Sequence, residues 1–395
     1  MLTYLTAAEA ANRLAVSRQT LYAYVSRGLL RAHDGDTARE SRYLAADVER
    51  LANQRATGRK PKEVAQAVLD WGLPVLPSAI TLIADGKYYY RGQNAVALAR
   101  SHGVEQIAAL LWQCPMETAF GPDAPLVPAI YPQVQAYYAG QRSEKSLLPL
   151  FTIASEDNPT AAWQKLSTRT AEGNGMLVRV MTACLLGTEP RTAAIHQQCA
   201  DAWGLDAEGA DLVRMALVLC ADHELNASGF TARCVASTGA SLRAAVIASL
   251  AALTGTRHGA NTARVEALWD EIEAADDHVT RLQQRLDRGD DLPGFGHHLY
   301  PDGDVRATVL LERILPHHPQ WRQMIAEAVG LAGQPPSVDF ALVALRRHLD
   351  LPPGAAFGIF ALGRTLGWIA HAMEQRQTQQ LIRPRAAYIG PRPMD

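Results

Sequence analysis

The chain has 395 residues, of which 48% are hydrophobic and 20% are charged, and its formal net charge is −2. This length allows two or three domains with a large core, and the near-neutral charge excludes a protein that coats nucleic acid along its whole length. The charge is uneven, because residues 1–62 contain 11 Lys and Arg against 6 Asp and Glu. A basic N-terminal segment on an acidic remainder indicates either two separate tasks or one task and a remnant.

Residues 1–56 have the pattern of a small helical module, called here the N-terminal head. Thr6-Ala-Ala-Glu9 is a capping box, which marks the start of a helix. Ser17 is placed to cap a second helix. The predicted elements are a helix through Leu14, a helix over Arg18–Arg27, two short strands within 29–44 around the turn Asp34-Gly35-Asp36, and a helix over Ala45–Gln54.

This order of elements is typical of a winged helix-turn-helix and resembles the DNA-binding heads of the MerR and excisionase type. The second helix would then face a major groove, and the hairpin would contact phosphates or the minor groove. Small three-helix modules also serve as protein-docking heads, so DNA binding and protein contact both remain open. The residues that would face DNA are Ser17, Arg18, Gln19, Tyr22, Arg27, Arg39 and Arg42.

After a linker at residues 57–78, the chain is predicted to be mainly helical. One exception is a hairpin within 78–90, where two apolar runs flank Asp85-Gly86. From Asn94 onward, segments with an apolar spacing near 3.6 follow one another, and prolines such as Pro149 are expected to separate the helices. Three strongly apolar helices are predicted within Asp211–Cys220, Ser241–Leu253 and Ala341–Leu345.

The cysteines and the apolar runs limit the cellular setting. The five cysteines show no CxxC or Cys/His ligand spacing, which predicts reduced thiols and no metal site. The longest apolar run, Ala244–Leu253, is far shorter than a membrane span, and the first residues lack the pattern of a secretory signal. We therefore expect a cytoplasmic protein that does not contact a membrane.

The common nucleotide-binding, serine-hydrolase and zinc-protease motifs are absent from the sequence. Chemistry must therefore come from polar groups that interrupt the apolar helical segments. These groups are Asp222-His223-Glu224, His258-Gly259, His297-His298, Asp304 with Arg306, Asp339, Arg364, and Arg383-Pro384-Arg385.

Each of these groups alone has an ordinary explanation. A histidine beside a glycine is often a turn residue, and an aspartate before a helix is usually an N-cap. Arg364 is the only charge between Leu351 and His371, and a buried guanidinium without a partner costs roughly 3–5 kcal/mol. Arg364 must therefore pair with a carboxylate of the protein or with the carboxylate of a bound ligand. Together, imidazoles, one carboxylate and several arginines fit a reaction that binds a polyanion and moves a proton to or from carbon.

In this order and spacing, the motifs resemble the citrate synthase family over about residues 79–395. The resemblance implies a mainly α, two-domain citrate synthase-like fold behind the winged helix-turn-helix head. A large helical domain would comprise 79–261 and 346–395, and a smaller one 262–345. The matching motifs are Tyr90-Arg-Gly92, Ala221-Asp-His-Glu-Leu-Asn226, His258-Gly-Ala260, Gly294-Phe-Gly-His297, Asp304-x-Arg306, Val338-Asp-Phe340, Arg364-Thr-Leu-Gly-Trp368-Ile-Ala-His371 and Arg383-Pro-Arg385.

The resemblance further implies condensation of acetyl-CoA or propionyl-CoA with oxaloacetate, without a cofactor, in a homodimer. Asp339 would take a proton from the acyl-CoA, His258 would donate to the enol or enolate oxygen, and His297 would polarise the ketone of oxaloacetate. The oxaloacetate carboxylates would be held by His223, Arg306, Arg364 and, from the second subunit, Arg383.

Two other functions stay open at this point. The body could sense citrate or acyl-CoA in a transcription regulator whose head binds DNA, or it could be a related lyase acting on citryl-CoA. Several neighbours depart from the family pattern, including His298 and Ala341-Leu342-Val343. The sequence therefore leaves the choice between acetyl-CoA and propionyl-CoA open.

Overall fold

The computed structural model describes residues 4–14, 16–26, 30, 32–34, 41–45, 48, 76–386 and 388–391. The chain forms two compact units, one of Met1–Pro77 with Arg385–Asp395 and one of Ser78–Pro384. The second unit is called here the body. Most of the predicted third helix of the head and of the 57–78 linker lies outside the described residues. None of the described helices has the length and apolarity needed to cross a membrane.

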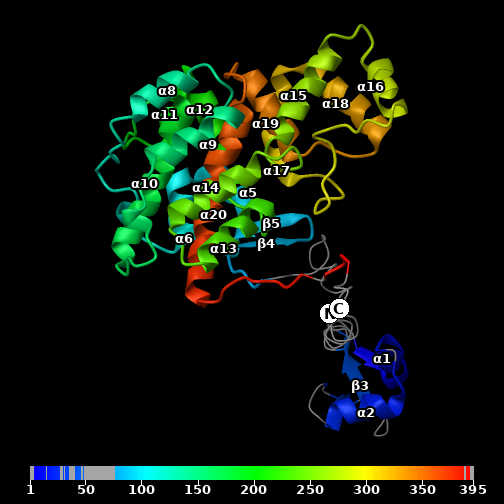
Figure 1. The fold of residues 1–395 in the computed structure, drawn as a ribbon. Coiled ribbons are helices and arrows are strands. Elements are labelled where there is room, and N and C mark those ends of the chain that lie inside the picture. Colours follow the sequence, from blue (N-terminus) through cyan, green and yellow to red (C-terminus); the bar gives the residue numbers. More distant parts are fainter. Residues whose placement is uncertain are drawn as a thin grey trace. The chain divides into compact units, whose positions relative to one another are not determined.

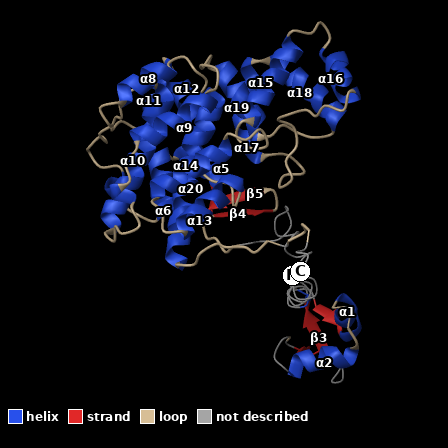
Figure 2. Ribbon diagram, in the orientation of Figure 1, coloured by secondary structure: helices blue, strands red, loops and turns tan. Residues whose placement is uncertain are grey.

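The N-terminal unit combines helices with a three-stranded antiparallel sheet in the order β1-β3-β2 (Figures 1 and 2). The predicted capping box is present, because Thr6 Oγ1 accepts from the Glu9 amide and Glu9 Oε2 accepts from the Thr6 amide. The predicted hairpin is also confirmed, whereas β1 was not predicted because three residues carry no strand pattern. The elements are β1 (Tyr4–Thr6), α1 (Ala7–Arg13), α2 (Arg18–Ser26), β2 (Ala32–Asp34) and β3 (Ser41–Leu44).

The body begins with a second antiparallel sheet, β4 (Thr81–Ala84), β5 (Lys87–Tyr90) and β6 (Gln93–Asn94). The predicted turn Asp85-Gly86 joins β4 to β5, and both of its residues have positive φ, 52° and 68°. Such a turn suits the twist of a hairpin. The two-residue strand β6 was not predicted.

Helices make up the rest of the body, as predicted. They are α5 (Ala95–Ser101), α6 (Val104–Trp112), α7 (Met116–Ala119), α8 (Tyr131–Tyr138), α9 (Ser143–Ala154), η1 (Asn158–Thr160), α10 (Ser167–Leu186), α11 (Ile195–Trp203), α12 (Ala207–Leu219), α13 (Ala227–Ser237), α14 (Leu242–Leu253), α15 (Asn261–Glu273), α16 (His278–Asp287), α17 (Val305–Ile314), η2 (Leu315–His317), α18 (Pro319–Ala332), α19 (Val338–His348) and α20 (Ala355–Thr378).

Helix α20 is the centre of the body. Every residue from Ala355 to Ala372 is buried, which agrees with a sequence that is apolar on all sides. The helix packs against α6, α9, α10, α12, α13, α14 and α19, and Figure 1 shows it among them. A charge on this helix, such as Arg364, is therefore placed in the interior of the protein.

Helices α15–α19 lie together at one side of the body (Figure 1), where α17 and α15 pack on α19 and α16 packs on α18. The sequence assigned most of this region, 262–345, to a smaller domain. These boundaries stay a prediction, since the body is one compact unit by its contacts.

Two details of the helix predictions were wrong. Pro149 does not separate helices but lies inside α9, where burial of Leu147, Leu150 and Phe151 offsets the roughly 3 kcal/mol cost of an interior proline. The apolar segment Ala341–Leu345 is only the middle of α19, which begins at Val338 after the N-cap position Ser337. Asp339 is therefore in the first turn of the helix and does not precede it.

Glycine at position 367 lets the segment after α12 lie directly on α20. A Cβ at Gly367 would lie 2.3 Å from Asp222 Oδ1 and 2.6 Å from the carbonyl oxygen of Ala221. Because a backbone oxygen cannot rotate away, we expect Gly367→Ala to destabilise the fold by about 1–3 kcal/mol. Gly330→Ala in α18 is the matched control, since a Cβ there meets nothing within 4 Å, and it should stabilise by about 0.5–1 kcal/mol. Urea unfolding of both variants tests this pair, and equal stabilities would contradict it.

Candidate active site

Five segments of the body bring polar side chains together around the middle of α20. They are the segment after α12, the loop before α15, the loop before α17 together with the first turn of that helix, the first turn of α19 and α20 itself. Each segment carries one of the motifs that the sequence singled out. The residues in question are His223, His258, His297, Arg306, Asp339 and Arg364.

His223 and His297 lie against each other. Their ring centroids are 5.2 Å apart and their planes are nearly perpendicular. Nε2 of His223 is 2.9 Å from the hydroxyl oxygen of Tyr300. Nδ1 of His297 accepts from the amide of Leu299 at 3.2 Å, so a neutral His297 ring carries its proton on Nε2. His297 is thereby prepared to donate a hydrogen bond from that atom.

Arg306 is buried and forms a two-pronged ion pair with Asp304. Nε and Nη2 of Arg306 lie 2.9 and 2.7 Å from the two carboxylate oxygens. Burial alone would lower the pKa of Arg306, but Asp304 more than offsets this and raises it. The same carboxylate accepts from the amide of Val338 at 3.0 Å. Asp304 thus ties Arg306 to the start of α19, next to Asp339.

Arg364 is 1% exposed, and its guanidinium is only partly satisfied. Nε donates to the carbonyl oxygen of Cys220 at 2.8 Å, while the buried Nη2 has no hydrogen-bond partner among the described residues. Burial lowers the pKa of Arg364, and the negative charge of Asp222 acts against that shift. A buried donor without a partner favours the second of the two explanations open from the sequence, a bound anion.

Asp339 has the surroundings of a base and not of an N-cap. Its Oδ2 accepts from the side-chain amide of Asn261 at 3.3 Å, and its Oδ1 is buried without a hydrogen-bond partner in the part of the chain that the structure describes. Burial raises the pKa of Asp339 to about 6, although Asn261, Arg306 and Arg364 oppose the shift. A carboxylate with such a pKa is a stronger base than one in water and is still ionised at pH 7.

His258 is held by a serine on α13. Its Nε2 lies 2.8 Å from Ser228 Oγ, which also accepts from Nε1 of Trp368 at 2.9 Å. The face of Phe360 on α20 is near both His258 and Arg364, with separations of 6.1 and 4.8 Å from its ring centroid. These contacts fix the imidazole beside the guanidinium.

The electrostatics show that the groups share one region. Arg364 depresses the pKa of both His223 and His258 and also acts on Asp339. Burial is the larger cause for the histidines and lowers the pKa of His258 to about 4; the pKa of His297 is likewise about 4. The histidines are therefore neutral at pH 7, so each can donate one hydrogen bond without carrying a charge.

Of the residues predicted for the site, the structure brings His223, His258, His297, Arg306, Asp339 and Arg364 together. Arg383 is exposed in the segment after α20 and bonds to none of the described residues. Its predicted place, in the site of a second subunit, is therefore not tested by one chain.

Several residues of this region were missed as site residues. Asn261 fixes Asp339, Ser228 and Trp368 fix His258, and Tyr300 contacts His223. Asn261 and Ser228 follow the histidine motifs closely, which is a usable signal. Trp368 and Tyr300 had no such signal, since buried aromatic residues are common in any core.

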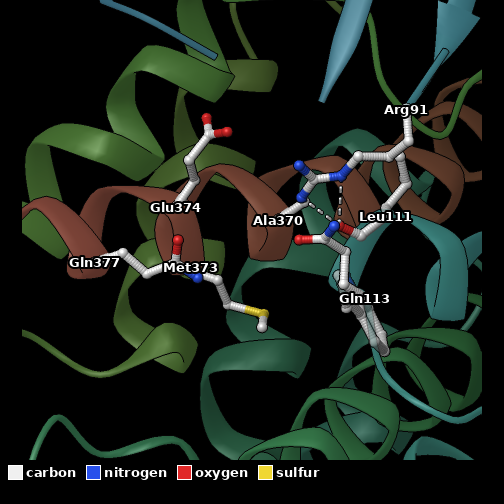
Figure 3. A pocket seen from close by; sticks show the side chains of 8 residues that line it. Arg91, Leu111, Gln113, Ala370, Met373, Glu374 and Gln377 are labelled. Atoms are coloured by element: carbon white, nitrogen blue, oxygen red, sulfur yellow. Dashed lines mark hydrogen bonds between the residues drawn. The ribbon is translucent and has the colours of Figure 1, made fainter. Parts of the chain in front are cut away.

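Two pockets elsewhere on the body do not belong to this cluster. The first, of about 30 Å³, is lined by residues such as Arg91, Gln113, Met373 and Glu374 (Figure 3). In it Arg91 donates to the carbonyl oxygen of Leu111 at 2.8 and 3.3 Å. Its volume suits about one or two water molecules. The second is a groove of about 350 Å³ along α17 and the start of α18. Among the described residues, no group of three or more His, Cys, Asp or Glu could hold a metal ion.

The predicted DNA-facing residues of the N-terminal unit are only partly described. Gln19 is exposed, Tyr22 is 53% exposed, and Arg42 lies on β3. Ser17 caps α2, since its Oγ accepts from the Thr20 amide at 3.2 Å, which leaves it less able to contact a base. The side chain of Arg18, at the start of α2, and the whole of Arg27 and Arg39 lie outside the described residues.

Both parts of the chain match models of known protein families. A family model described as "Citrate synthase, C-terminal domain" matches residues 134–385, and one described as "Helix-turn-helix domain" matches residues 4–56. Citrate synthase 2 of Bacillus subtilis is 28% identical over 353 residues, which cover 81% of this chain and 95% of that protein. The 2-methylcitrate synthase of Shewanella oneidensis is 32% identical over 197 residues, which cover 45% of this chain and 50% of that protein.

A solved structure shows the same fold. It is the ternary complex of carboxymethyl coenzyme A and oxaloacetate with citrate synthase from Thermoplasma acidophilum. The TM-score is 0.68 at 21% identity, over 82% of this chain and 96% of that one. The family model spans more than half of the sequence, and the body has the family's helical fold. The chain therefore belongs to the citrate synthase family.

Proposed function

We propose that the protein condenses a short acyl-CoA with oxaloacetate, giving citrate or 2-methylcitrate and free CoA. The observation that carries the proposal is the gathering of Asp339, His258 and His297 around two buried arginines, Arg306 and Arg364. The relatives named citrate synthase and 2-methylcitrate synthase support both acyl donors. The reaction needs no metal and no organic cofactor beyond its substrates.

In the first step, Asp339 takes a proton from the carbon next to the thioester. Its Oδ1 is buried and has no hydrogen-bond partner among the described residues, so it is the atom placed to receive the proton. Asn261 holds Oδ2 and keeps the carboxylate in one orientation. His258 donates to the thioester oxygen, which gains negative charge as the carbon loses its proton.

The tautomer of His258 depends on Ser228. The serine hydroxyl has one proton, which it donates to Oδ1 of Asn226 at 2.8 Å, and it accepts from Trp368 Nε1. We infer that this proton turns from Asn226 to Nε2 of His258 when the acyl-CoA binds, so that the neutral ring then carries its own proton on Nδ1 and donates it in a hydrogen bond. The buried Trp368 thus orients the serine, and the serine orients the proton of the imidazole.

In the second step, the new carbon nucleophile attacks the ketone carbon of oxaloacetate. His297 donates from Nε2 to the ketone oxygen and gives up that proton as the C–C bond forms, so the oxygen becomes a hydroxyl; the proton that Asp339 took from the acyl-CoA then restores the neutral imidazole and leaves Asp339 ionised again. The oxaloacetate carboxylates bind to the buried donors of Arg364 and Arg306, with His223 beside them. Hydrolysis of the thioester then releases CoA.

The ionisation of Asp339 predicts the pH dependence of the reaction. The base works only when ionised, and burial raises its pKa to about 6. Both His258 and His297 have a pKa of about 4 and stay neutral above pH 5. We therefore expect kcat/KM for the acyl-CoA to be constant above pH 7 and to fall about tenfold per pH unit well below pH 6. A profile that stays flat down to pH 4.5 would contradict the assignment of Asp339 as the base.

The proposal includes a homodimer in which Arg383 reaches the site of the partner subunit. The guanidinium would add a bidentate donor for an oxaloacetate carboxylate. Arg383→Ala should then raise the KM for oxaloacetate, whereas Arg142→Ala, another exposed arginine, should not. An unchanged KM in the Arg383 variant would remove this part of the proposal.

The N-terminal unit supports a second function, the binding of DNA. Its match to a helix-turn-helix model and the exposed Gln19 and Tyr22 on α2 favour it. A gel-shift series with genomic fragments should show binding that weakens steeply as salt is raised, and Tyr22→Ala should weaken it further. No shift at low salt would exclude DNA binding. A body that only senses ligands is not favoured, because sensing does not need the buried base Asp339.

Thiol release tests the condensation directly. The assay compares acetyl-CoA and propionyl-CoA, each with and without oxaloacetate. Oxaloacetate-dependent turnover with one or both donors supports the proposal, and the ratio of the two kcat/KM values identifies the acyl preference. Turnover below about one-thousandth of an ordinary enzyme rate of roughly 10 s⁻¹ with both donors would reject it.

A further inference from the structure

The segment Cys220–His223 is attached to one face of α20 at three successive levels. The Cys220 carbonyl accepts from Arg364 Nε at 2.8 Å, and the Ala221 carbonyl accepts from the Gly367 amide at 2.9 Å. At the third level, Asp222 Oδ1 lies 3.3 Å from Nε2 of His371, which is a close charge contact and not an aligned hydrogen bond. Positions 364, 367 and 371 are spaced by three and four residues, so they share one face of the helix.

Asp222 is a fully buried carboxylate with no assigned task. Its Oδ2 accepts from Thr81 Oγ1 on β4 at 2.5 Å, and its Oδ1 rests on Gly367, the only residue type that leaves room for it. Burial alone would raise the pKa of Asp222, but His371, Arg364 and Thr81 together hold it below its ordinary value. Asp222 is therefore an anion in the interior, beside the substrate site.

His371 continues this arrangement away from the site. Its Nδ1 accepts from Nε of Arg233 at 3.1 Å, so a neutral ring carries its proton on Nε2, the atom nearest Asp222. Arg233 pairs with Glu374, whose Oε1 accepts from the Ala79 amide at 2.8 Å. The polar chain thus begins and ends at the hairpin, through Thr81 and Ala79.

The position of Asp222 gives the buried Arg364 a negative charge nearby without a hydrogen bond between the two side chains. The buried Arg364 needs a counter-charge, and a carboxylate bonded to it as Asp304 is bonded to Arg306 would occupy two of the donors that a substrate carboxylate could use. Asp222 acts on Arg364 through its charge, while Nη2 of Arg364 stays without a hydrogen-bond partner among the described residues. The next residue after Asp222 is His223, so the same carboxylate also fixes the backbone that carries this imidazole.

We propose that Asp222 and His371 are positioning residues for the binding of oxaloacetate, which fix His223 relative to Arg364 and supply the counter-charge of Arg364. The inference rests on the proposed function for the identity of the ligand. Neither residue touches the substrate. Their removal should therefore weaken oxaloacetate binding much more than acyl-CoA binding.

The test uses the full chain and measures two quantities for each variant. Calorimetric titration gives the Kd of oxaloacetate without turnover, and thiol release gives the KM of each substrate. Asp222→Asn keeps the size of the side chain and removes its charge, and we expect it to raise the Kd and KM of oxaloacetate roughly 30- to 100-fold, the lower end of the range for a lost buried charge partner. The KM of the acyl-CoA should change less than about threefold, since a loss of general integrity would change both.

Two further substitutions separate positioning from simple stability. His371→Leu should weaken oxaloacetate binding about tenfold, whereas His371→Gln, which keeps an N–H donor near Asp222, should largely restore it. Glu266→Gln is the matched control, because Glu266 is a buried carboxylate paired with Arg346 and Arg347 and lies outside this chain of contacts. It should lower the melting temperature without changing the Kd of oxaloacetate.

The outcomes are distinguishable. Equal Kd values for the parent and Asp222→Asn would overturn the inference, and so would an equal effect on both substrates. If Asp222→Asn does not fold, two other measurements test the inference. Thr81→Val removes one hydrogen bond to Asp222, and it should raise the Kd of oxaloacetate more than the KM of the acyl-CoA. The comparison of His371→Leu with His371→Gln tests the same difference between the substrates. A parent that binds oxaloacetate but releases no thiol would overturn the proposed condensation while leaving this inference to be decided by the Kd values.

Discussion

Asp339→Asn is expected to lower kcat about 10³-fold, within the range that general-base catalysis contributes. The amide has the same shape as the carboxylate but cannot accept the proton from the acyl-CoA. Binding should be nearly unchanged, because Asn261 still has an oxygen to bond. The matched control is Asp350→Asn, an exposed aspartate beyond the end of α19, which should keep full activity.

The same substitution should make the protein more stable at pH 7. Asp339 has an ordinary pKa near 3.8 when unfolded and about 6 when folded. The folded state therefore binds the proton more tightly, and its stability falls as the pH rises from about 4 to about 6. Above this window the cost reaches at most about 3 kcal/mol, and asparagine removes it. Urea unfolding at pH 7 and at pH 4 should show a gain that is larger at pH 7.

A loss of activity together with a gain in stability is a strong signature, because damage to the fold lowers both. If Asp339→Asn turned over as fast as the parent, the base would be another residue. If it were inactive and also less stable at pH 7, the buried charge of Asp339 would not destabilise the folded protein as its raised pKa indicates.

Arg364→Met is expected to have the second large effect. Methionine retains an unbranched apolar chain but removes the guanidinium that is buried beside His258 and Phe360. Loss of a buried charge that pairs with a ligand carboxylate costs about 2–5 kcal/mol, so kcat/KM for oxaloacetate should fall roughly 10²- to 10³-fold. Most of this loss should be in the KM of oxaloacetate.

Arg169→Met is the control for the arginine, since Arg169 is half-exposed and pairs with Glu172 on the surface. A surface pair contributes about 0–1 kcal/mol, so this variant should have parental kinetics. Equal kinetics for Arg364→Met and Arg169→Met would show that Arg364 binds no substrate carboxylate. If Arg364→Met raised the KM of the acyl-CoA more than the KM of oxaloacetate, Arg364 would bind the acyl-CoA and not oxaloacetate.

Local pattern predicted those features that depend on neighbouring residues. The capping box at Thr6, the hairpin at Asp85-Gly86 and the all-apolar helix α20 were all found where the sequence placed them. Arg364 was recognised because a single charge in such a helix must have a partner or a ligand. Pro149 shows the limit of a local rule, because the packing of α9 outweighs the preference of proline to end helices.

The contacts that complete the site join residues far apart in the sequence. Asn261 and Asp339 are 78 residues apart, Ser228 and Trp368 are 140 apart, and Thr81 and Asp222 are 141 apart. No periodicity links such pairs, and each was available only from the folded chain. The pattern around Asp339 left an N-cap and a base both open; its position in the first turn of α19 and its partner Asn261 exclude the N-cap, while its role as the base stays a prediction.

The measurement that tests the central claim most directly is the mass balance of the reaction. Full-length protein is mixed with acetyl-CoA and oxaloacetate, and free CoA and tricarboxylic acid are quantified in the same sample, with propionyl-CoA in a parallel sample. We predict one molecule of citrate or 2-methylcitrate for each CoA released, and no release without oxaloacetate. Thiol release without a tricarboxylic acid, or the absence of both products, would show that His258, His297 and Asp339 do not form a condensing site.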